Sequence, residues 1–272
     1  MGGLAGGATA DGQVLPTAVR RERMLAALKT REFTRVTELE RMFGVSAVTI
    51  RGDLAALAHR GEVRRVHGGA MPIATPRAER SFEDSASAHA EEKRAIGRAA
   101  AALVSSGDTV ALDVGTTTTA IALALVQRDD LHDVTVFTNG LNIALELERA
   151  APRVTVVVSG GTLRPLQHSL VNPMADVLLS GLNPDLAFVG CNGVHPRRGV
   201  TNVNLPEAEV KRRMLALAAR RVIVADGSKL GEVAVAHLCG VADIDLLLTG
   251  ASAPAAVLDE LRALDVTIEL AG

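Results

Sequence analysis

A short polar segment after an apolar run has the residue types needed to bind an anion. The run TVALDV leads into GTTTTA, so that Gly115 allows a tight turn and four threonines open the following helix. Hydroxyls and the first backbone N–H groups of a helix donate hydrogen bonds, and the helix dipole favours negative charge there. The segment is a candidate phosphate-binding loop, with a threonine-rich helix cap as the alternative. It lacks the Gly-Lys-Ser/Thr of a Walker loop and the GxGxxG of dinucleotide-binding folds.

Further polar residues and glycines follow other apolar runs. Asn139 comes after VTVFT, Gly160 and Gly161 follow VTVVVS, and RVIVAD ends at Asp226, shortly before Lys229. In a parallel sheet such positions share the edge at which ligands bind. We therefore expect them near the candidate phosphate loop, where Lys229 would supply a positive charge. A salt bridge between Asp226 and Lys229 is the alternative for that lysine.

A second group of residues, near the amino terminus, has the chemistry of DNA recognition. The segment SAVTIRGDLAALAHR predicts a helix that Ser46 caps and Gly61 ends, with Ile50, Leu54 and Leu57 on its apolar face. Its outward side carries an arginine suited to guanine, small apolar side chains suited to thymine methyl groups, and hydroxyls suited to phosphate. The candidate DNA-binding residues of this helix are Ser46, Ala47, Val48, Thr49 and Arg51.

The segment EVRRVHGGAM, which follows this helix, predicts a short β-ribbon. Val63 and Val66 bracket two arginines, and a pair of glycines allows a tight reversal. Arg64, Arg65 and His67 would add phosphate or minor-groove contacts. Solvated surface is the alternative for each arginine taken alone, but their joint placement beside the reading helix favours DNA.

Two helices precede the reading helix. The first starts at Ala18 and has apolar residues at helical spacing, and the second has Thr37 as its predicted N-cap and Gly44 as the residue that ends it. Three helices followed by a basic ribbon predict a winged helix-turn-helix over residues 18–71.

Beyond residue 88, β-branched runs alternate with helical segments. The predicted strands are TVALDV, VTVFT, VTVVVS, DLAFVG, RVIVAD, IDLLLT and VTIEL, and the predicted helices begin at Thr117, Leu141, Pro206 and Pro254. Nearly continuous Val and Leu runs are typical of a parallel sheet covered on both faces. The predicted fold class is α/β, with the winged helix-turn-helix joined to a larger, mostly parallel sheet domain over residues 89–272.

Composition sets the remaining boundaries. Residues 1–17 are rich in glycine and alanine and predict a disordered leader, and residues 72–88 turn to Pro, Ala, Ser and charge, which predicts a linker. Residues 18–71 contain eleven Lys and Arg against six Asp and Glu, in a chain of net charge −2. A basic module joined to an acidic remainder indicates that only the first meets a polyanion, although a solvated surface would give the same count.

Several function classes are excluded by composition. The chain has five Phe and no Tyr or Trp, so stacking on aromatic platforms is not expected. Cys191 and Cys239 are too few for a disulfide framework or a zinc site, and we expect buried thiols in a reducing cytosol. No run approaches the roughly 18 apolar residues of a membrane helix. We expect a cytoplasmic protein that contacts no membrane and needs no cofactor or metal ion.

The reading segment carries a family resemblance. VSAVTIRGDLAALAHRGEVRRVHGGA resembles the signature of the DeoR family of bacterial repressors, in which VS, TIR, DL and R-x-HGGA recur at these intervals. Gly52 departs from the pattern, because the family commonly has a second basic residue after Arg51. Glycine costs roughly 1 kcal/mol in a helix interior and removes a DNA contact, so operator affinity or sequence choice is affected.

The C-terminal half is similar to the effector domain of the same family, which itself resembles ribose 5-phosphate isomerase; the likeness covers about residues 18 to 250. Matching segments start at Lys93, Asp113, Thr138, Gly160, Phe188, Glu207 and Asp226. The resemblance implies that Thr116, Thr117 and Thr118 hold a phosphate. It also implies that Asp113, Asn139, Glu207 and Lys229 reach the sugar hydroxyls or the phosphate, with Glu209 as the alternative to Glu207.

The same comparison argues against catalysis. Aldose-ketose isomerisation needs a carboxylate base, and isomerases of this fold carry acids after the strand that matches DLAFVG. This chain has Gly190, Cys191, Asn192 and Gly193 there. Asn172 and Gly250 also stand where the family usually has glycine and aspartate, which alters the shape of the pocket rim.

We therefore expect a repressor of a sugar or polyol catabolic operon, which a phosphorylated sugar or polyol releases from double-stranded operator DNA. A homodimer or tetramer formed through residues 90–272 would bring two helix-turn-helix units to the two half-sites of a repeated or palindromic operator. The alternatives are a sugar-phosphate isomerase with a DNA-binding appendage, and a DNA-binding protein whose α/β half serves only for oligomerisation.

Overall fold

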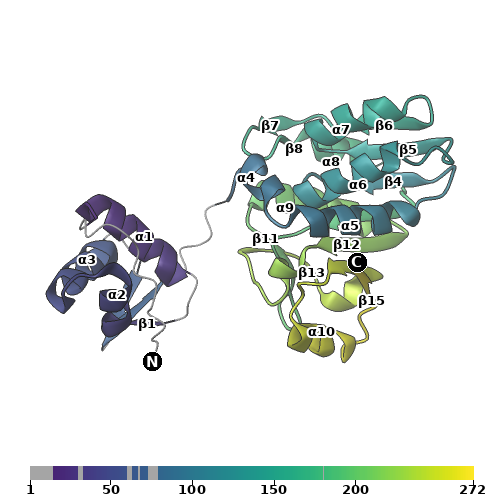
Figure 1. The fold of residues 1–272 in the computed structure, drawn as a ribbon. Coiled ribbons are helices and arrows are strands. Elements are labelled where there is room, and N and C mark those ends of the chain that lie inside the picture. Colours follow the sequence, from purple (N-terminus) through teal and green to yellow (C-terminus); the bar gives the residue numbers. More distant parts are fainter. Residues whose placement is uncertain (1–14, 30–32, 60–62, 67, 73–78, 180) are drawn as a thin grey trace, which may run out of the picture. The chain divides into compact units, whose positions relative to one another are not determined.

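The computed structural model describes residues 15–29, 33–59, 63–66, 68–72, 79–179 and 181–272. The chain divides into two compact units, Met1–Pro76 and Arg77–Gly272 (Figure 1). We call them the N-terminal and the C-terminal unit and describe each by itself. Residues 1–14 of the predicted leader lie outside the described residues, and Thr17 already opens helix α1 (Thr17–Lys29).

The N-terminal unit is the predicted winged helix-turn-helix. Its elements are α1, β1 (Thr34–Arg35), α2 (Val36–Phe43), α3 (Ala47–His59), β2 (Val63–Val66) and β3 (Gly69–Pro72), and its strands pair antiparallel in the order β1-β3-β2. The apolar faces of the three helices meet in a core that includes Met24, Leu28, Leu39, Ile50, Leu54 and Leu57. The predicted ribbon is confirmed, and β1 is an additional strand that the sequence pattern did not indicate.

The helix ends of this unit agree with the sequence at two positions and differ at one. Gly44 ends α2 at a φ of 64°, and the Thr49 N–H donates to Ser46 Oγ at 3.3 Å, as predicted. The predicted N-cap at Thr37 is wrong, because α2 begins at Val36 after Arg35. Arg35 is held in an extended conformation by its pairing with Gly69, so the helix starts directly from β1 without a side-chain cap.

Helix α4 (Phe82–Ser87) lies inside the segment predicted as a linker. The Asp84 N–H donates to Ser81 Oγ at 3.1 Å, which caps the helix. Residues 79–88 therefore belong to the folded C-terminal unit, whereas residues 73–78 lie outside the described residues. Six residues are too few to show a helical apolar period in the sequence, which explains the difference.

The C-terminal unit is built on a seven-stranded parallel sheet. Its strands are β4 (Thr109–Leu112), β5 (Val134–Thr138), β6 (Val154–Val158), β9 (Leu186–Gly190), β12 (Arg220–Ala225), β14 (Leu246–Gly250) and β15 (Ile268–Ala271). The order across the sheet is β15-β14-β12-β9-β4-β5-β6, and every neighbouring pair is parallel. These are the seven strands that the Val- and Leu-rich runs predict, so the α/β fold class is confirmed.

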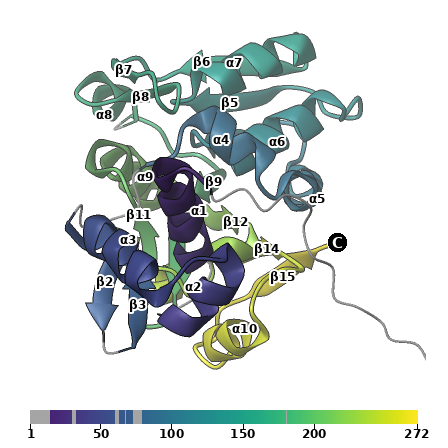
Figure 2. The same ribbon diagram turned by 60° about the vertical axis from the view of Figure 1, so that its left-hand side comes forward.

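Helices cover both faces of this sheet (Figure 2). One face packs on α5 (Ala90–Ala102), α6 (Thr116–Val126) and α7 (Leu141–Leu147), and the other on α8 (Met174–Leu179), α9 (Leu205–Leu217) and α10 (Ala255–Arg262). Alternate strand residues face the two cores: Val110 and Leu112 point to the first, and Ala111 to the second. This two-sided burial explains why the strand sequences are apolar throughout.

Smaller elements complete the unit. The second face also packs on an antiparallel sheet of β10 (Gly193–His195), β11 (Gly199–Asn202) and β13 (Ala236–Cys239). Strands β7 (Thr162–Arg164) and β8 (Ser169–Val171) form a hairpin, and 3₁₀ turns lie at η1 (Glu148–Ala150), η2 (Gly227–Lys229) and η3 (Val241–Asp243).

The strand order creates a switch point between β4 and β9. From β4 the chain proceeds to β5 and β6 on one side, and from β9 to β12, β14 and β15 on the other. Ligands of open parallel sheets bind beyond the carboxyl ends of the strands at such a point. We call the segments that follow β4, β5, β6, β9, β12 and β14 the polar rim.

Candidate functional sites

The predicted DNA-binding residues of α3 lie together on its first turns. Ser46, Val48 and Arg51 are exposed, Val48 to 77%, while Ala47 and Thr49 are half-buried. The hydroxyls of Ser46 and Thr49 are 3.1 Å apart and bond each other. This end of α3 therefore presents a guanidinium, two hydroxyls and small apolar side chains on one surface.

A buried ion-pair cluster fixes α3 against α1. Asp53 is 2% exposed and accepts from Arg20 Nε and from Arg21 Nε, each at 2.7 Å. Burial by itself would raise the pKa of Asp53, but the hydrogen bonds from the two arginines outweigh it and hold the pKa below its usual value. Sequence analysis missed this contact, although an acidic residue on the apolar face of α3, beside Leu54, was the available signal.

Gly52 and the wing can be placed as well. Gly52 is exposed on α3, and a Cβ added there meets no atom within 4 Å, so packing does not require glycine at this position. Arg64 and Arg65 are exposed on β2, and Arg64 Nη2 donates to Met71 Sδ at 3.6 Å. His67 lies outside the described residues.

The candidate phosphate loop occupies the switch point. Gly115, at a φ of 152°, precedes α6, and its carbonyl accepts from Thr119 N at 2.9 Å, Thr118 Oγ1 at 2.9 Å and Thr119 Oγ1 at 2.7 Å. The hydroxyl of Thr118 therefore bonds within the loop, and Thr118 is fully buried. The first N–H groups of a helix have no acceptor within it, so the Thr116 and Thr117 turn can donate to an anion.

Asn139 holds this loop in place from the end of β5. Its Oδ1 accepts from Val114 N at 2.9 Å and its Nδ2 donates to Leu170 O at 3.2 Å. The side chain is fully buried. Asn139 therefore links the loop to the β7–β8 hairpin, and both ends of its amide have protein partners.

Asp113 forms a buried ion pair with Lys211, a residue of α9 that sequence analysis did not single out. Lys211 Nζ donates to Asp113 Oδ2 and, at 3.0 Å, to the carbonyl of Gly190, whose N–H donates to Asp113 Oδ2 at 3.2 Å. The pair therefore connects β4 and β9 at the switch point. Burial raises the pKa of Asp113 to about 6, against the opposing effect of Lys211. Asp113 Oδ1 is buried without a hydrogen-bond partner among the described residues.

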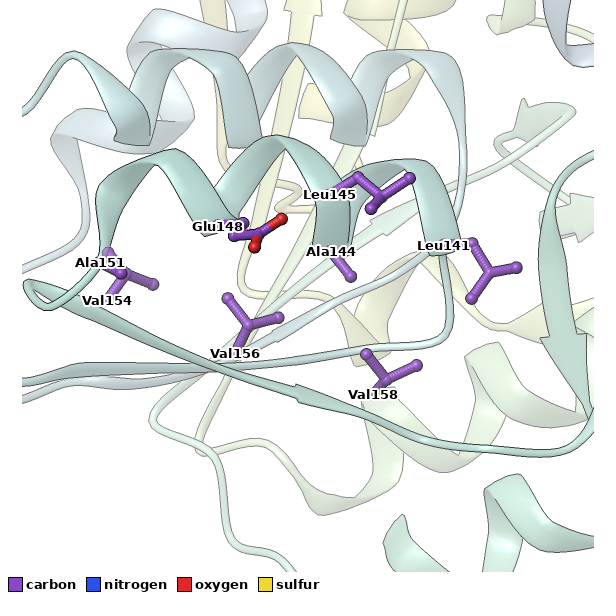
Figure 3. A pocket seen from close by; sticks show the side chains of 8 residues that line it. All are labelled: Leu141, Ala144, Leu145, Glu148, Ala151, Val154, Val156 and Val158. Carbon is purple, nitrogen blue, oxygen red and sulfur yellow. The ribbon is translucent and has the colours of Figure 1, made fainter.

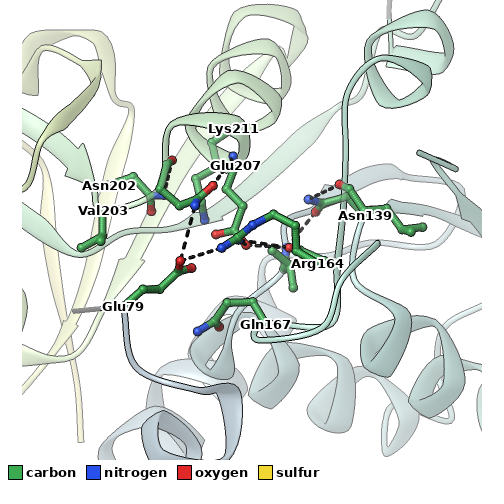
Figure 4. A network of polar contacts seen from close by, with 12 residues as sticks. Glu79, Asn139, Arg164, Gln167, Asn202, Val203, Glu207 and Lys211 are labelled. Carbon is green, nitrogen blue, oxygen red and sulfur yellow. Dashed lines mark hydrogen bonds and ion pairs between the residues drawn. The ribbon is translucent and has the colours of Figure 1, made fainter. Parts of the chain in front are cut away.

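Glu207 belongs to a polar network that Figure 4 shows. It accepts from Arg164 Nη1 and, at 2.6 Å, from Ser169 Oγ, and Arg164 Nη2 donates to Glu79 at 2.6 Å. Glu209 is exposed and pairs with Arg212, so Glu207, and not Glu209, faces the interior of the unit. Sequence analysis did not identify Arg164 or Glu79, because both lie in short polar segments outside the predicted elements.

The remaining predicted rim residues are spread across the sheet. Lys229 lies after β12, with its side chain 28% exposed and its Nζ 3.9 Å from Asp226 Oδ2, so the alternative salt bridge is long. Gly160 and Gly161 are exposed after β6. A Cβ on Gly161 would be 2.2 Å from Val171 O, so this glycine allows the β7–β8 hairpin to pack closely.

Gly250 is explained by Glu92. A Cβ at position 250 would lie 2.0 Å from Glu92 Cγ, so the side chain of Glu92 fills the space that a larger residue would need. Glu92 accepts from Ser252 Oγ at 2.8 Å and Gly227 N at 3.1 Å, and it lies within 4.8 Å of ligand atoms of His89 and Asp226. These three side chains could hold a metal ion, but the carboxylate of Glu92 already has donors from two rim segments.

The two cysteines were expected to be buried, but both are half-buried. Cys191 and Cys239 are both free thiols, and burial raises the pKa of each to about 12. Cys191 follows β9, where the isomerase comparison requires acids, and the next residue, Asn192, accepts from Val203 N at 2.9 Å. The segment after β9 thus offers no base for proton transfer.

An apolar groove lies between α7 and the edge strand β6 (Figure 3). Its volume is about 510 Å³, and it is lined by Leu141, Ala144, Leu145, Glu148, Ala151, Val154, Val156 and Val158. Leu145 is 68% exposed. The lining suits apolar side chains and lacks the donors that a phosphorylated ligand needs.

A winged helix-turn-helix and an α/β unit with an anion-binding type of loop at its switch point together define a DNA-binding transcription regulator with a sensor domain. The chain belongs to the DeoR family. Residues 20–75 match the DeoR-like helix-turn-helix domain, and residues 88–251 match the DeoR C terminal sensor domain. The predicted family and the predicted class, a transcription regulator rather than an enzyme, are confirmed.

Relatives of known name cover nearly the whole chain. It is 34% identical to the putative aga operon transcriptional repressor of Escherichia coli O157:H7, over 97% of this chain and 98% of that protein. It is 33% identical to the HTH-type transcriptional regulator GlpR of Haloferax volcanii, over 92% and 96%.

Two solved structures are also similar. The full-length sorbitol operon regulator SorC of Klebsiella pneumoniae has a TM-score of 0.41 at 14% identity, over 90% of this chain and 98% of that chain. Ribose 5-phosphate isomerase a of Methanocaldococcus jannaschii has a TM-score of 0.40 at 17% identity, over 53% and 55%. Within the described part of the chain, no helix combines the length and apolarity needed to cross a membrane.

Proposed function

We propose that this protein represses a sugar or polyol catabolic operon and leaves its double-stranded operator DNA when it binds a phosphorylated sugar or polyol. The observation that carries the proposal is the Gly115 loop at the N-terminus of α6, at the switch point of the sheet, in a chain whose other unit reads DNA. Relatives named for the aga operon and the glycerol-3-phosphate regulon support it. The protein would act in the cytoplasm, where its operator is found.

We assign the phosphate of this effector to the first turn of α6. The backbone N–H groups and hydroxyls of Thr116 and Thr117 would donate to it, and the helix dipole favours the negative charge. The backbone of Thr118 adds a further N–H, because its hydroxyl bonds to Gly115 O. Lys229 lies two strands away in the sheet, about 10 Å at the usual strand spacing, and its long side chain would approach from that side.

The other predicted ligand residues fit supporting roles better than direct contact. Asp113 and Asn139 are fully buried and bonded to protein partners, so we propose that they hold the loop in shape. Glu207 would shape the sugar end of the site through Arg164. Gly160 and Gly161 would border the site on the β6 side, where Gly161 allows close packing of the β7–β8 hairpin.

On the DNA side, we propose that the first turns of α3 enter the major groove. Arg51 would pair with guanine, Ala47 and Val48 would contact a thymine methyl group, and Ser46 and Thr49 would bond a phosphate. The exposed wing arginines would contact the backbone, together with His67. Asp53 would set the angle of the reading helix through its bonds to α1.

We further propose that the protein works as a homodimer or tetramer assembled through residues 90–272. One helix-turn-helix reads one half-site, so specific binding calls for a second copy. The apolar groove beside edge strand β6 is the surface that we assign to this second copy, because edge strands with exposed apolar residues associate with further chains unless they are covered.

A thermal-shift screen of phosphorylated sugars and polyols on the full chain tests the effector class. A ligand that binds only the native state stabilises it by about 2.7 kcal/mol at a hundredfold excess over Kd. The expected result is stabilisation by a phosphorylated compound, no effect of its dephosphorylated form, and a loss of the shift in Thr117→Ala. A screen in which no phosphorylated compound raises the melting temperature would contradict the proposed effector.

A further inference from the structure

The β7–β8 hairpin is fastened to the candidate phosphate loop. Ser169 bridges to Gly140 at the end of β5, and the N–H of Leu170 donates to Asn139 O at 2.8 Å. Asn139 in turn bonds both Leu170 O and the N–H of Val114, which immediately precedes Gly115. A change in the loop therefore reaches the hairpin through one fully buried side chain.

The same hairpin holds the segment of residues 79–83, the first described residues of the C-terminal unit. Arg164 pairs with Glu79 at 2.6 Å, Gln167 Nε2 donates to the carbonyl of Arg80, and the Phe82 N–H donates to Leu166 O at 2.9 Å. His168 Nε2 lies 2.9 Å from a carboxylate oxygen of Glu83, and the rings of Phe82 and His168 pack edge to face at 5.6 Å. Along the chain, this segment follows the N-terminal unit, which contains the helix-turn-helix.

Arg164 lies between the carboxylates of Glu207 and Glu79, and the rest of the protein binds Glu207 more extensively than Glu79. Glu207 is 7% exposed, also accepts from Ser169 Oγ, and has its N–H bonded to Asn204 Oδ1 at the start of α9. Glu79 is 18% exposed, and its oxygen atoms have Arg164 and, at 3.4 Å, Asn204 Nδ2 as partners. Arg164 can therefore lose its bond to Glu79 while the N-terminus of α9 stays capped by Asn204.

We infer that the Arg164–Glu79 ion pair is a latch that the bound effector opens. The inference rests on the proposed function and adds its regulation. With its phosphate on the first turn of α6, the effector brings its sugar or polyol oxygens toward a guanidinium that already faces two carboxylates (Figure 4). A guanidinium has five donors in a planar fork and binds phosphate and hydroxyl oxygens readily. New bonds from Arg164 to these oxygens replace its bond to Glu79 and release residues 79–83 from the hairpin.

Hydrogen exchange of the full chain, read at the amide of Phe82, tests the latch. Glu79→Gln keeps the shape of the side chain and removes its charge, and in ligand-free protein it should speed Phe82 exchange at least about tenfold, because a charge-assisted contact of the segment is lost. The matched control is Glu91→Gln, which breaks the exposed Glu91–Arg94 pair on α5 and should leave Phe82 exchange unchanged. Equal protection of Phe82 in wild type and Glu79→Gln would overturn the latch, whatever the effector is.

Glycerol 3-phosphate and ribose 5-phosphate serve as probes of opening, with a thermal-shift reading of the same samples. A probe that stabilises the protein should speed Phe82 exchange in wild type and have little further effect on Glu79→Gln. A probe that binds but leaves Phe82 protected would show that the latch is not opened by the effector, while the proposed function would stand. If neither probe nor any other phosphorylated compound of the screen binds, the effector class fails, and the release step fails with it.

Discussion

At the scale of single residues, the ion pair of Asp113 and Lys211 holds the strands together at the switch point. Both side chains are almost fully buried, and together they join β4, β9 and α9, with Asp113 two residues before Gly115. A buried pair contributes little compared with an apolar pair of the same size, but removal of one partner leaves a buried charge uncompensated. Loss of Lys211 alone would thus leave the Asp113 carboxylate buried without a counter-charge at a pH above its raised pKa of about 6.

Lys211→Met should therefore lower the free energy of unfolding of the C-terminal unit by about 3–5 kcal/mol. The double variant Lys211→Met, Asp113→Asn removes both charges and should recover a large part of this loss. Chemical denaturation of the three proteins measures the difference. A single variant as stable as wild type would show that the pair does not carry its charges in the folded protein.

Asp113 also predicts a dependence of stability on pH. Since burial raises its folded pKa to about 6, the folded protein holds this proton more tightly than the unfolded chain. The stability that Asp113 contributes is thus fully present below its unfolded pKa of about 3.9 and is lost as the pH rises through about 6. Wild type should gain stability relative to Asp113→Asn when the pH is lowered from about 7 to about 5. A constant difference over this range would argue against the raised pKa.

Individual residues are also expected to contribute differently to DNA recognition. Arg51→Ala should cost about 1–3 kcal/mol on a specific operator and relax base choice at one position. Arg64→Ala with Arg65→Ala should weaken binding to all sequences and flatten the salt dependence, because phosphate contacts release counterions. Gly52→Arg, at a position with room for a side chain, should tighten binding. Titrations of operator and unrelated DNA at several salt concentrations distinguish these effects, and equal affinities for all variants would contradict the assigned interface.

At the scale of elements, helices and strands could be predicted from the sequence wherever their burial produces a regular pattern of apolar residues. The strands of the parallel sheet are buried on two faces and read as Val and Leu runs, and the Gly115 loop stands where a strand meets a helix. The β7–β8 hairpin and α4 consist of elements of three to six residues, which are too short to show such a period. The pairs Lys211 with Asp113 and Arg164 with Glu79 join residues 98 and 85 positions apart, and neither spacing nor composition encodes such contacts.

The same reasoning explains which predicted ligand residues changed role. Polar residues at strand ends are expected to face a ligand, and Thr116 and Lys229 are half-exposed there, whereas the side chain of Thr117 is buried. Asn139 and Asp113 follow the same pattern in the sequence but have protein partners at the switch point. Sequence position thus identifies the edge of the sheet, while the tertiary contacts decide which side chains can reach a ligand.

At the scale of the whole molecule, the proposed assembly places a second copy against the apolar groove beside β6. Leu145 is exposed in the groove beside β6, and a charge there would oppose burial against a second copy. Leu145→Asp should shift the protein from dimer or tetramer toward monomer in light scattering at micromolar concentration. Leu264→Asp, an exposed leucine outside the groove, is the matched control. A wild-type protein that is monomeric with and without DNA would refute the assembly.

The proposed function joins an operator reader and a phosphate loop in one chain, so effector and DNA must bind different arrangements, with reciprocal coupling. Operator binding by fluorescence anisotropy, with and without the phosphorylated compound found in the screen, tests this most directly. Typical couplings predict that a saturating effector weakens wild-type operator binding by roughly 5- to 150-fold. Thr117→Ala combined with Lys229→Ala should bind the operator normally and fail to respond. Wild-type protein that binds the compound and keeps its full operator affinity would contradict the account, as would a double variant that still releases DNA at the wild-type effector concentration.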